Sequence, residues 1–473
     1  MSLSRRSVLA ASSAALLPAA MLPAANPPRR PNILLLFPDQ WRPDWGGWNS
    51  GLDIRTPHID SLRKRGIQFT YATVPSPLCA PSRACLASGC EYTKCGVASN
   101  AQDYPLQQAT FYQLLQRSGY HTMACGKVDL HKKTLDWGVD GRRLTREWGF
   151  SSAIDNAGKR DAPRSVQLAG HPTDPYMAML QSRGLMQAHI DDFAHRAEYK
   201  DTFPTPLPDS AYCDNWIGQN GLELLRRAPG NTPWFLQVNF TGPHGPMDIT
   251  AAMESRARRR AYPQPFGNNQ FEPAVHTAIR QNYTAMCENL DAWVGRYLDF
   301  LRQSRQLDHT IVVFSSDHGE MLGDHNRWGK TLPYQASVAV PLIAAGPGIA
   351  SGIRSSALAS VHDLAATALD YAGVEAPSSM DSRSLRGVLE GKRKRHREFL
   401  RSGLNQWRMA WDGQYKLITG FAPQAQANAS KAAPAASNVP PLLFDHHADP
   451  NEANNVYTAR PEVVRRLTEM IHA

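Results

Sequence analysis

Asn32-Ile33-Leu34-Leu35-Leu36-Phe37 is a largely apolar run that ends at Pro38-Asp39-Gln40. A run without polar alternation is typical of a β-strand that is buried on both faces, as in the parallel sheets of α/β proteins. Similar short runs recur at residues 121–125, 234–240, 310–314 and 340–344. We therefore expect these five segments to be buried strands of one central sheet.

Amphipathic helices are expected between these runs. Thr110 suits the N-cap of a helix over residues 111–117, with Gly119 as the stop signal. The clearest helical pattern covers residues 276–304, where the apolar residues recur three and four apart. These are Ile279, Tyr283, Met286, Leu290, Val294, Tyr297, Leu298 and Leu301. Strands that alternate with such helices predict an α/β fold with a large, mostly parallel central sheet flanked by helices.

Length and composition restrict the class of protein. The chain has 473 residues, of which 42% are hydrophobic and 20% charged, so it suits one large globular domain with an appendage. After the N-terminus, no apolar run reaches the roughly 18 residues that a transmembrane helix needs. The net charge of +9 favours anionic partners. Seven cysteines are too few for a disulfide scaffold, and their spacing assigns no disulfide.

The first 26 residues have the pattern of an export signal. Ser4-Arg5-Arg6-Ser7-Val8-Leu9 precedes an Ala/Leu-rich stretch that ends before Asn26-Pro27-Pro28. The paired arginines and the mild hydrophobicity favour the twin-arginine route, and an ordinary secretory signal or a disordered tail are the alternatives. The pattern predicts a periplasmic or secreted protein.

The character of the sequence changes near residues 391–397. Short segments follow, and Asp412-Gly413 between residues 409–411 and 415–418 is a hairpin signal. With a final helix over residues 461–472, they predict a small α+β C-terminal subdomain over residues 396–473, after a large domain over residues 31–390.

Two segments in this region have a biased composition. Residues 422–441 are rich in Ala, Gln, Pro and Ser, which predicts a mobile loop. The basic run at residues 392–397 is interpreted as a solvated linker. A nucleic-acid patch is the weaker interpretation, because no nucleic-acid-binding module accompanies the run.

Polar and charged residues directly follow four of the predicted strands. They are Asp39 and Gln40 after the first, Lys127 after the second, His244 after the third, and Asp317, His318 and Glu320 after the fourth. Ligands of open α/β sheets bind beyond the carboxyl ends of the strands, so we expect these side chains at one edge. The oxygen ligands of Asp39, Gln40 and Asp317, together with His318, suit Ca²⁺ or Mg²⁺ and also allow Mn²⁺. For any one of them, a helix N-cap is the alternative.

A further cluster of functional residues begins at Cys79-Ala80-Pro81-Ser82-Arg83. Pro81 marks a helix start, so the helix N-terminus faces Cys79 and attracts an anion. Arg83 adds a positive charge beside it. A buried structural cysteine is the alternative for Cys79. We interpret Cys85, Cys90, Cys95, Cys125, Cys213 and Cys287 as buried or loop thiols.

The Cys79 stretch resembles the signature of the type I, formylglycine-dependent sulfatases of the alkaline-phosphatase-like superfamily. Other stretches resemble that family in the same order along the chain. They are residues 31–40, Thr56-Pro57-His58-Ile59-Asp60-Ser61-Leu62, residues 316–325 with Trp328-Gly329-Lys330, and Leu443-Phe444-Asp445 with Asp449-Pro450-Asn451-Glu452. The resemblance implies the sulfatase fold and the hydrolysis of a sulfuric ester.

The resemblance also implies roles for individual residues. A formylglycine-generating or maturase enzyme would oxidise Cys79 to formylglycine, whose hydrate attacks sulfur. The metal ligands would be Asp39, Gln40, Cys79, Asp317 and His318. Arg83, Lys127 and Lys330 would share the transition-state charge. His244 would give a proton to the leaving alcohol.

The chain departs from the family pattern after the second predicted strand. Many members have Lys-x-His there, whereas this chain has Lys127-Val128-Asp129. Either Asp129 or His131 is expected to replace the missing histidine, and a solvated loop is the alternative. A minority branch with this change includes uronate 2-sulfatases, which points to carbohydrate.

The expected substrate is an anionic sulfated compound, and a sulfated carbohydrate is favoured. A phosphate or phosphonate monoester hydrolase of the same superfamily is the first alternative, because the same metal residues occur there. A non-catalytic polyanion-binding relative is the second. Neither a nucleic-acid partner nor a transmembrane segment is expected.

Overall fold

The structure is a computed structural model that describes residues 30–257, 260–267, 270–423 and 439–472. The predicted signal at residues 1–26 and most of the predicted mobile loop at residues 422–441 lie outside the described residues. Among the described helices, none is both long enough and apolar enough to cross a bilayer.

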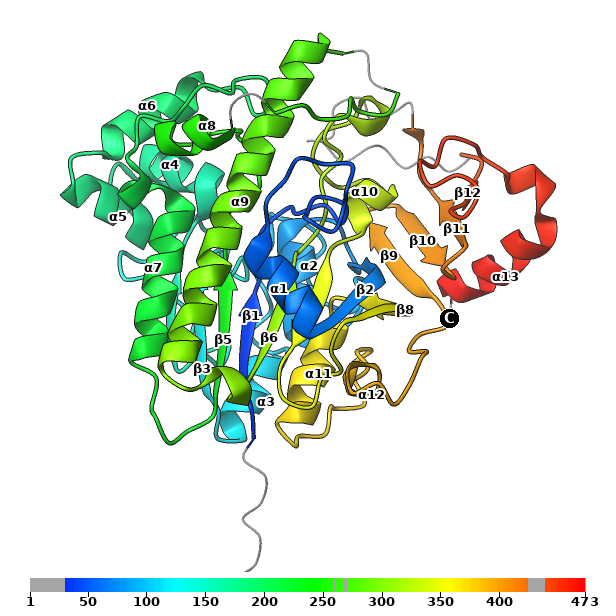
Figure 1. The fold of residues 1–473 in the computed structure, drawn as a ribbon, viewed down its shortest axis with the longest axis horizontal. Coiled ribbons are helices and arrows are strands. Elements are labelled where there is room, and N and C mark those ends of the chain that lie inside the picture. Colours follow the sequence, from blue (N-terminus) through cyan, green and yellow to red (C-terminus); the bar gives the residue numbers. More distant parts are fainter. Residues whose placement is uncertain (1–29, 258–259, 268–269, 424–438, 473) are drawn as a thin grey trace, which may run out of the picture.

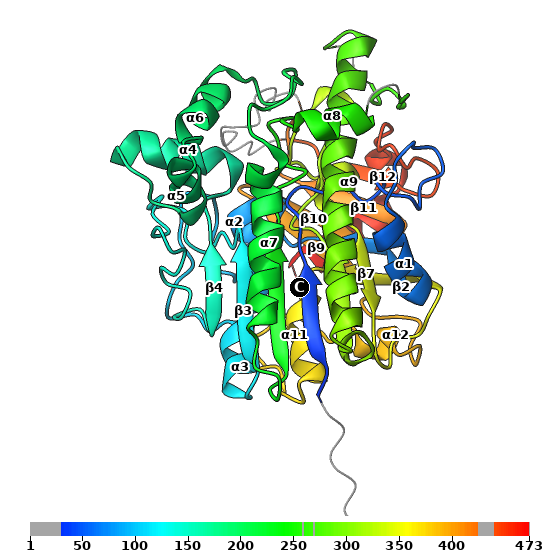
Figure 2. The same cartoon turned by 60° about the vertical axis from the view of Figure 1, so that its left-hand side comes forward.

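The central sheet has eight strands in the order β4-β3-β5-β1-β6-β7-β2-β8. Figure 1 shows β3, β5, β1 and β6 side by side, and Figure 2 labels β4 and β7. Their bounds are β1 Asn32–Leu36, β2 Gly66–Thr73, β3 His121–Gly126, β4 Ser152–Asp155, β5 Trp234–Asn239, β6 Thr310–Ser315, β7 Leu342–Ala345 and β8 Ile353–Ser360. Strand β7 runs antiparallel to its neighbours β6 and β2, and the other neighbouring pairs are parallel. The predicted large, mostly parallel sheet is confirmed.

Strand β1 lies near the middle of the sheet, between β5 and β6, and its side chains enter two separate cores. Leu34 and Leu36 belong to the cluster under α9, whereas Ile33 and Leu35 belong to the cluster on the opposite face. Burial on both faces explains why the strand is a run of apolar residues without polar alternation.

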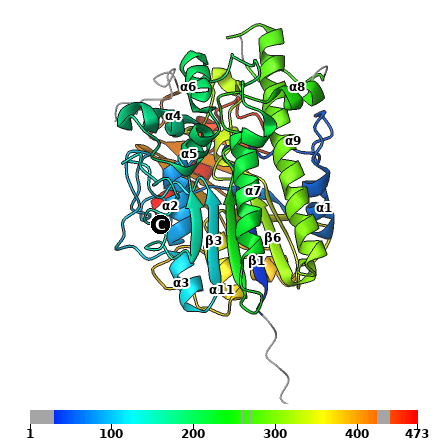
Figure 3. The ribbon, with the colours of Figure 1, turned by 90° about the vertical axis from the view of Figure 1, so that its left-hand side faces the viewer.

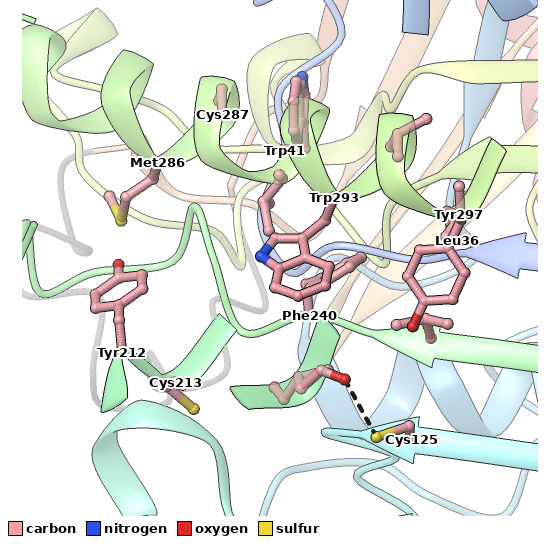
Figure 4. Packing of buried hydrophobic residues seen from close by; sticks show 14 of the residues in the cluster. Leu36, Trp41, Cys125, Tyr212, Cys213, Phe240, Met286, Cys287, Trp293 and Tyr297 are labelled. Carbon is pink, nitrogen blue, oxygen red and sulfur yellow. Dashed lines mark hydrogen bonds between the residues drawn. The ribbon is translucent and has the colours of Figure 1, made fainter. Parts of the chain in front are cut away.

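Helices cover both faces of the sheet (Figures 2 and 3). On one face lie α1 (Pro57–Arg65), α7 (Cys213–Arg226) and α9 (Pro273–Gln303), and on the other α2 (Cys79–Ser88), α3 (Phe111–Arg117) and α11 (Asp363–Tyr371). The Thr110 cap of α3 is confirmed, since its side chain accepts from Gln113 N in a capping box. All eight apolar positions predicted for α9 are buried. Figure 4 shows Trp293 and Tyr297 of α9 packed among Leu36 and Phe240.

Further helices lie beyond the carboxyl ends of the strands, at the top of Figure 2. These are α4 (Gly158–Ala169), α5 (Pro175–Ser182), α6 (Met186–His195) and α8 (Ala251–Ala257). Two short helices remain: α10 (Gln335–Val338) precedes β7 in the chain, and α12 (Arg386–Leu389) follows α11. Helix α4 therefore stands at the edge where the sequence predicts the site.

A second sheet with the order β12-β11-β10-β9 closes the chain. Its strands are antiparallel, with bounds β9 Leu400–Leu404, β10 Trp407–Trp411, β11 Tyr415–Thr419 and β12 Leu442–Asp445. One face packs on the large sheet's unit through residues such as Met321 and Tyr334, and α13 (Pro461–His472) covers the other. The predicted small α+β unit and its hairpin at Asp412-Gly413 are present.

The sequence analysis interpreted the basic run at residues 392–397 as a solvated linker. The structure confirms this for only part of the run. Residues 392–395 are exposed. His396 Nε2, in contrast, lies 3.0 Å from the buried Asp363 Oδ2, and Arg397 Nε donates to the same oxygen at 2.8 Å. The end of the run is fixed to the start of α11 because a buried carboxylate needs cationic or hydrogen-bonding partners.

Candidate active site

Four potential ligand residues converge where β1 and β6 end and α2 begins. Asp39 follows β1, Asp317 and His318 follow β6, and Cys79 is the first residue of α2. One ligand atom from each of these four buried residues lies within 4.8 Å of all the others. Cys79 Sγ is 3.3 Å from His318 Nε2 and 3.9 Å from Asp39 Oδ1. The structure thus brings the predicted cysteine and three predicted metal ligands together.

Gln40 joins this cluster through an unusual backbone conformation. Its φ of 70° is left-handed, and its backbone N–H donates to Asp317 Oδ1 at 3.0 Å. The side-chain nitrogen donates to Glu320, and the side-chain oxygen accepts from Lys330 Nζ at 2.6 Å. Such a conformation costs about 1–3 kcal/mol and persists where surrounding contacts fix it, as they do here.

The donor set fits a hard divalent cation. Two carboxylates, one imidazole and the amide oxygen of Gln40 provide mainly oxygen ligands, which Ca²⁺ and Mg²⁺ prefer. Burial raises the pKa of Asp39, but Lys127, Lys330 and the nearby histidines outweigh it and hold the pKa well below its usual value. Asp39 is therefore ionised, as a metal ligand must be.

Arg83 lies beneath the two carboxylates. Its Nε donates to Asp317 Oδ2 at 3.0 Å, and one terminal nitrogen lies 3.4 Å from Asp39 Oδ2. The other terminal nitrogen donates to the Lys127 carbonyl and, at 3.0 Å, to Asn239 Oδ1. The side chain is only 2% exposed and does not line the cavity described below. Arg83 therefore fixes the carboxylates, whereas the sequence assigned it to the charge on the substrate.

Lys127 lies between Asp39 and Asp129, the residue at which the chain departs from the family pattern. Its ammonium pairs with Asp39 and lies 3.3 Å from Asp129 Oδ2. Asp129 also binds Lys132 Nζ at 2.9 Å. Burial raises the pKa of Asp129, but the two lysines outweigh it and lower the pKa to about 2. Asp129 thus reaches the site through Lys127.

His131 faces away from the cluster. Its Nε2 lies 2.8 Å from the Asp136 carbonyl and close to the Thr134 hydroxyl. Trp137 and Trp148 flank the ring. Among the described contacts of His131, none reaches Cys79 or a predicted metal ligand. Of the two residues that the sequence left as alternatives, the structure brings only Asp129 to the site.

His244 lies beside the cluster after β5. Its Nδ1 donates to the Gly245 carbonyl, so Nε2 carries no proton in the neutral ring. Burial, together with Lys330 and Lys127, holds the pKa of His244 well below its usual value. The ring is therefore neutral at pH 7 and accepts a hydrogen bond at Nε2.

An open cavity of about 860 Å³ leads to this cluster. Gln40, Cys79, Lys127, His244 and Lys330 are among the residues that line it. Eight lining residues are basic, namely Lys127, Lys132, Lys133, Lys159, Arg160, Arg164, Arg327 and Lys330, whereas Asp161 and Glu198 are its acidic residues. The cavity therefore attracts anions.

Several residues position the side chains of the site but were assigned no role from the sequence. Glu320 accepts from the Gln40 side chain and lies 3.2 Å from the Tyr199 hydroxyl. Asn239, the last residue of β5, accepts from Arg83, and Asn100 caps α2 by accepting from Ala80 N at 3.0 Å. Like Asp39, Glu320 and Asn239 lie at or after the carboxyl end of a predicted strand, so the strand-end rule, which expects site residues at these positions, also covers them. The position of Asn100 in a loop gave no such signal.

The chain is similar in sequence to known sulfatases. The sequence model of the sulfatase family matches residues 31–374. An arylsulfatase of Clostridium perfringens is 25% identical over 395 residues, covering 78% of this chain and 81% of that enzyme. An N-acetylglucosamine-6-O-sulfatase of Bacteroides thetaiotaomicron is 26% identical over 508 aligned residues, covering 97% and 89%.

Solved structures share the fold. The phosphonate monoester hydrolase of Agrobacterium radiobacter superposes with a TM-score of 0.72 at 20% identity, over 92% of this chain and 93% of that one. At this identity the likeness shows the fold alone. The family match, in contrast, covers most of the chain, and so the chain belongs to the sulfatase family of the alkaline-phosphatase-like superfamily and is a sulfuric ester hydrolase.

Proposed function

We propose that the enzyme releases sulfate from a sulfated carbohydrate, using formylglycine derived from Cys79 and a divalent cation. The observation that carries this proposal is the position of Cys79. It begins α2 at the end of a basic cavity, within 3.9 Å of both His318 Nε2 and Asp39 Oδ1. A helix N-terminus favours an anion at this point.

Asp39, Gln40, Asp317 and His318 would hold the cation, which is Ca²⁺ in our proposal, with Mg²⁺ or Mn²⁺ as alternatives. Together, a hydrated formylglycine and the cation supply a nucleophilic oxygen at neutral pH and offset the negative charge of the ester. Arg83 contributes by fixing the two carboxylates in one orientation. This positioning matters because misplacing reacting groups by about 1 Å can cost a factor of 10² in rate.

Lys127 and Lys330 line the cavity, and the charges of both act on Cys79, the proposed nucleophile, where they lower its pKa against the effect of burial. Their ammonium groups are held by Asp39 and by Gln40, respectively. Both are placed to donate to the anionic oxygens of the ester as charge shifts during the reaction. Donors of this type typically contribute a factor of 10²–10³ in rate.

His244 and Lys330 are the two candidates for helping the leaving oxygen. His244 is neutral, so it must first take up a proton at Nε2 before it can donate one. Lys330 carries protons already, and its Nζ lies 2.6 Å from Gln40 Oε1 at the same edge of the site. We assign the main stabilisation of the leaving oxygen to Lys330. His244 Nε2 would take the proton that the attacking hydroxyl loses and give it to the leaving oxygen.

Two features of the cavity support a carbohydrate substrate. The excess of basic residues suits a substrate with several negative charges. The rings of Tyr199 and Trp328, which both line the cavity, lie 4.7 Å apart and provide an amphipathic surface of the kind that accommodates sugar rings. The relative from Bacteroides thetaiotaomicron is named as a sulfatase of N-acetylglucosamine.

The alternatives make different predictions for activity. A phosphate or phosphonate monoester hydrolase would share the fold and the metal residues, as the structural likeness above illustrates. A non-catalytic polyanion-binding relative would bind sulfated sugars without turnover. The intact set of Cys79, Lys127, His244 and Lys330 argues against the latter.

Export is part of the proposal. We propose that residues 1–26 direct the protein to the periplasm or the medium by the twin-arginine route. That route carries folded proteins, so a formylglycine-generating or maturase enzyme would act on Cys79 before export. Arg5→Lys with Arg6→Lys should leave the enzyme in the cytoplasm; unchanged export in cell fractions would refute the twin-arginine assignment.

The decisive experiment combines mass spectrometry with a substrate panel. The peptide that contains Cys79 should carry formylglycine, and sulfated sugars should be hydrolysed faster than matched phosphate and phosphonate esters. Cys79→Ala should abolish turnover with little change in thermal stability. Turnover by this variant within about tenfold of the parent, or a preference for phosphonates, would contradict the proposal.

A further inference from the structure

One wall of the cavity is built from cations that the reaction itself does not use. Lys132 and Lys133 come from the loop after β3, and Arg160 and Arg164 come from α4. We call these four residues the basic wall. Lys159, the fifth cation here, is buried and already paired with Asp248 at 2.8 Å.

Lys132 fixes the wall next to the proposed reaction centre. Its side chain is only 9% exposed, and its ammonium contacts Asp129 at 2.9 Å and Asp161 at 3.2 Å. Lys127 lies 3.3 Å from the same oxygen, Asp129 Oδ2. The two ammonium groups are therefore adjacent, one at the proposed nucleophile and the other at the wall.

The remaining cations of the wall are available to a ligand. The side chains of Arg160 and Arg164 are 57% and 65% exposed, and they pair with Glu198 at 3.0 Å and Asp161 at 3.7 Å. Exposed pairs of this kind contribute little and rearrange readily. Lys133 is exposed; its backbone N–H donates to Asp103 Oδ1 at 2.7 Å, but its ammonium has no carboxylate partner among the residues that the structure describes.

The charges around Asp129 and Asp161 do not balance. The four cations of the basic wall face three carboxylates, those of Asp129, Asp161 and Glu198, and Asp129 is shared with Lys127, which also pairs with Asp39. Two carboxylates occupy two of the three N–H bonds of Lys132, which also lines the cavity. An anionic group of a ligand would supply the missing partner.

We propose that the basic wall is a second anion-binding subsite, which takes a second sulfate or a carboxylate on the same sugar ring or the adjacent one. This inference rests on the proposed function, because it assumes that the first sulfate sits at Cys79 and Lys127. It narrows the substrate to a carbohydrate with at least two anionic groups.

The test compares three disaccharides that differ in one group: one with a single sulfate, one with a second sulfate, and one with a carboxylate in place of that second sulfate. The variant is Lys133→Gln with Arg164→Gln, whose side chains are exposed, so the fold should be retained. The matched control is Lys64→Gln with Arg227→Gln, two exposed cations outside the cavity.

At constant ionic strength, the variant should lower kcat/KM about tenfold for the doubly charged substrates and less than twofold for the monosulfated one. The estimate follows from two lost charges at about 5 Å in water, each contributing roughly a factor of three to four. The control should change all three values less than twofold. A larger loss for the disulfated substrate than for the carboxylated one identifies a second sulfate as the natural group, and the reverse identifies a carboxylate. An equal loss on all three substrates would overturn the subsite.

Binding to Cys79→Ala separates this inference from the proposed function. In calorimetry, this inactive protein should bind the disulfated disaccharide several-fold tighter than the monosulfated one, and the wall variant should remove that difference. If the parent hydrolyses no sulfate ester but this preference holds, the proposed function fails and the subsite stands. If the parent is an active sulfatase without the preference, the subsite is refuted alone.

Discussion

Replacing Arg83 with alanine tests whether this residue holds the site together from below. The guanidinium is 2% exposed and contacts two buried carboxylates, Asp39 and Asp317. Lys127 and Lys330 remain to offset Asp39 in the variant. Asp317, in contrast, loses its closest full positive charge, the Arg83 nitrogen at 2.9 Å.

The expected cost follows from the burial of this charge. Removing one partner of a buried ion pair typically destabilises a protein by about 3–5 kcal/mol, and the cavity left by the side chain adds to this value. The shift in Tm per kcal/mol falls with chain length, so the value of about 2–4 °C per kcal/mol for domains of 150–250 residues is an upper bound for this longer chain. We therefore expect the unfolding transition of Arg83→Ala to fall by roughly 5–10 °C.

The assay is thermal and urea unfolding followed by circular dichroism in the presence of a chelator. Arg227→Ala is the matched control, because this arginine is exposed and, within the part of the chain that the structure describes, forms an ion pair with the surface residue Glu223 alone. It should change the free energy of unfolding by less than about 1 kcal/mol. If Arg83→Ala also stays within 1 kcal/mol of the parent, Arg83 does not stabilise the two carboxylates, and its role must lie with the substrate.

Three other outcomes are expected. Asp39→Asn with Asp317→Asn should lose the bound cation in elemental analysis, because an oxygen-rich site depends on ligand charge; full occupancy would contradict the site. Lys330→Ala should lower kcat by about 10²–10³ for sugar sulfates and by less for aryl sulfates with acidic leaving groups, which need less help; an equal loss would remove Lys330 from the leaving oxygen. Burial raises the pKa of Glu452, but Lys416 and His446 outweigh it and lower the pKa from 4.5 to about 2. Its contribution, about 3 kcal/mol at most, is full above pH 4.5 and lost toward pH 2, so the lower Tm of Glu452→Gln at pH 7 should converge with the parent's in acid; a constant difference would refute this.

The sheet centre and the site edge were predictable because burial leaves a clear sequence pattern. Strands β1, β3, β5 and β6 are surrounded on both faces, so each is a short apolar run with polar residues at its carboxyl end. The strand-end rule therefore found Asp39 and Asp317 before any contact was known. Helix α9 was equally clear, because a long helix repeats its apolar spacing many times.

The other strands gave weaker signals for physical reasons. Strand β8 is an edge strand whose first residues are exposed, and its sequence Ile353–Ser360 has little apolar character. Strand β4, at the opposite edge, has only four residues with alternating burial. Strand β2 contains polar positions and a bulge near Phe69. Edge strands need fewer apolar residues, so their patterns resemble loops.

The structure explains why an aspartate stands at position 129, where many family members have a histidine. The explanation involves Lys132, which contacts Asp129. A neutral histidine at this position would leave the buried ammonium groups of Lys127 and Lys132 without a shared anion. Asp129 supplies that anion, with its backbone held at a φ of 58° and both lysines within 3.3 Å. Lys132 belongs to the cavity wall. The aspartate at position 129 and the cation at the wall therefore depend on each other. In our proposal, Asp129 therefore does not replace the histidine as a catalytic base but connects Lys127 to a second positive charge, that of Lys132, which faces the substrate.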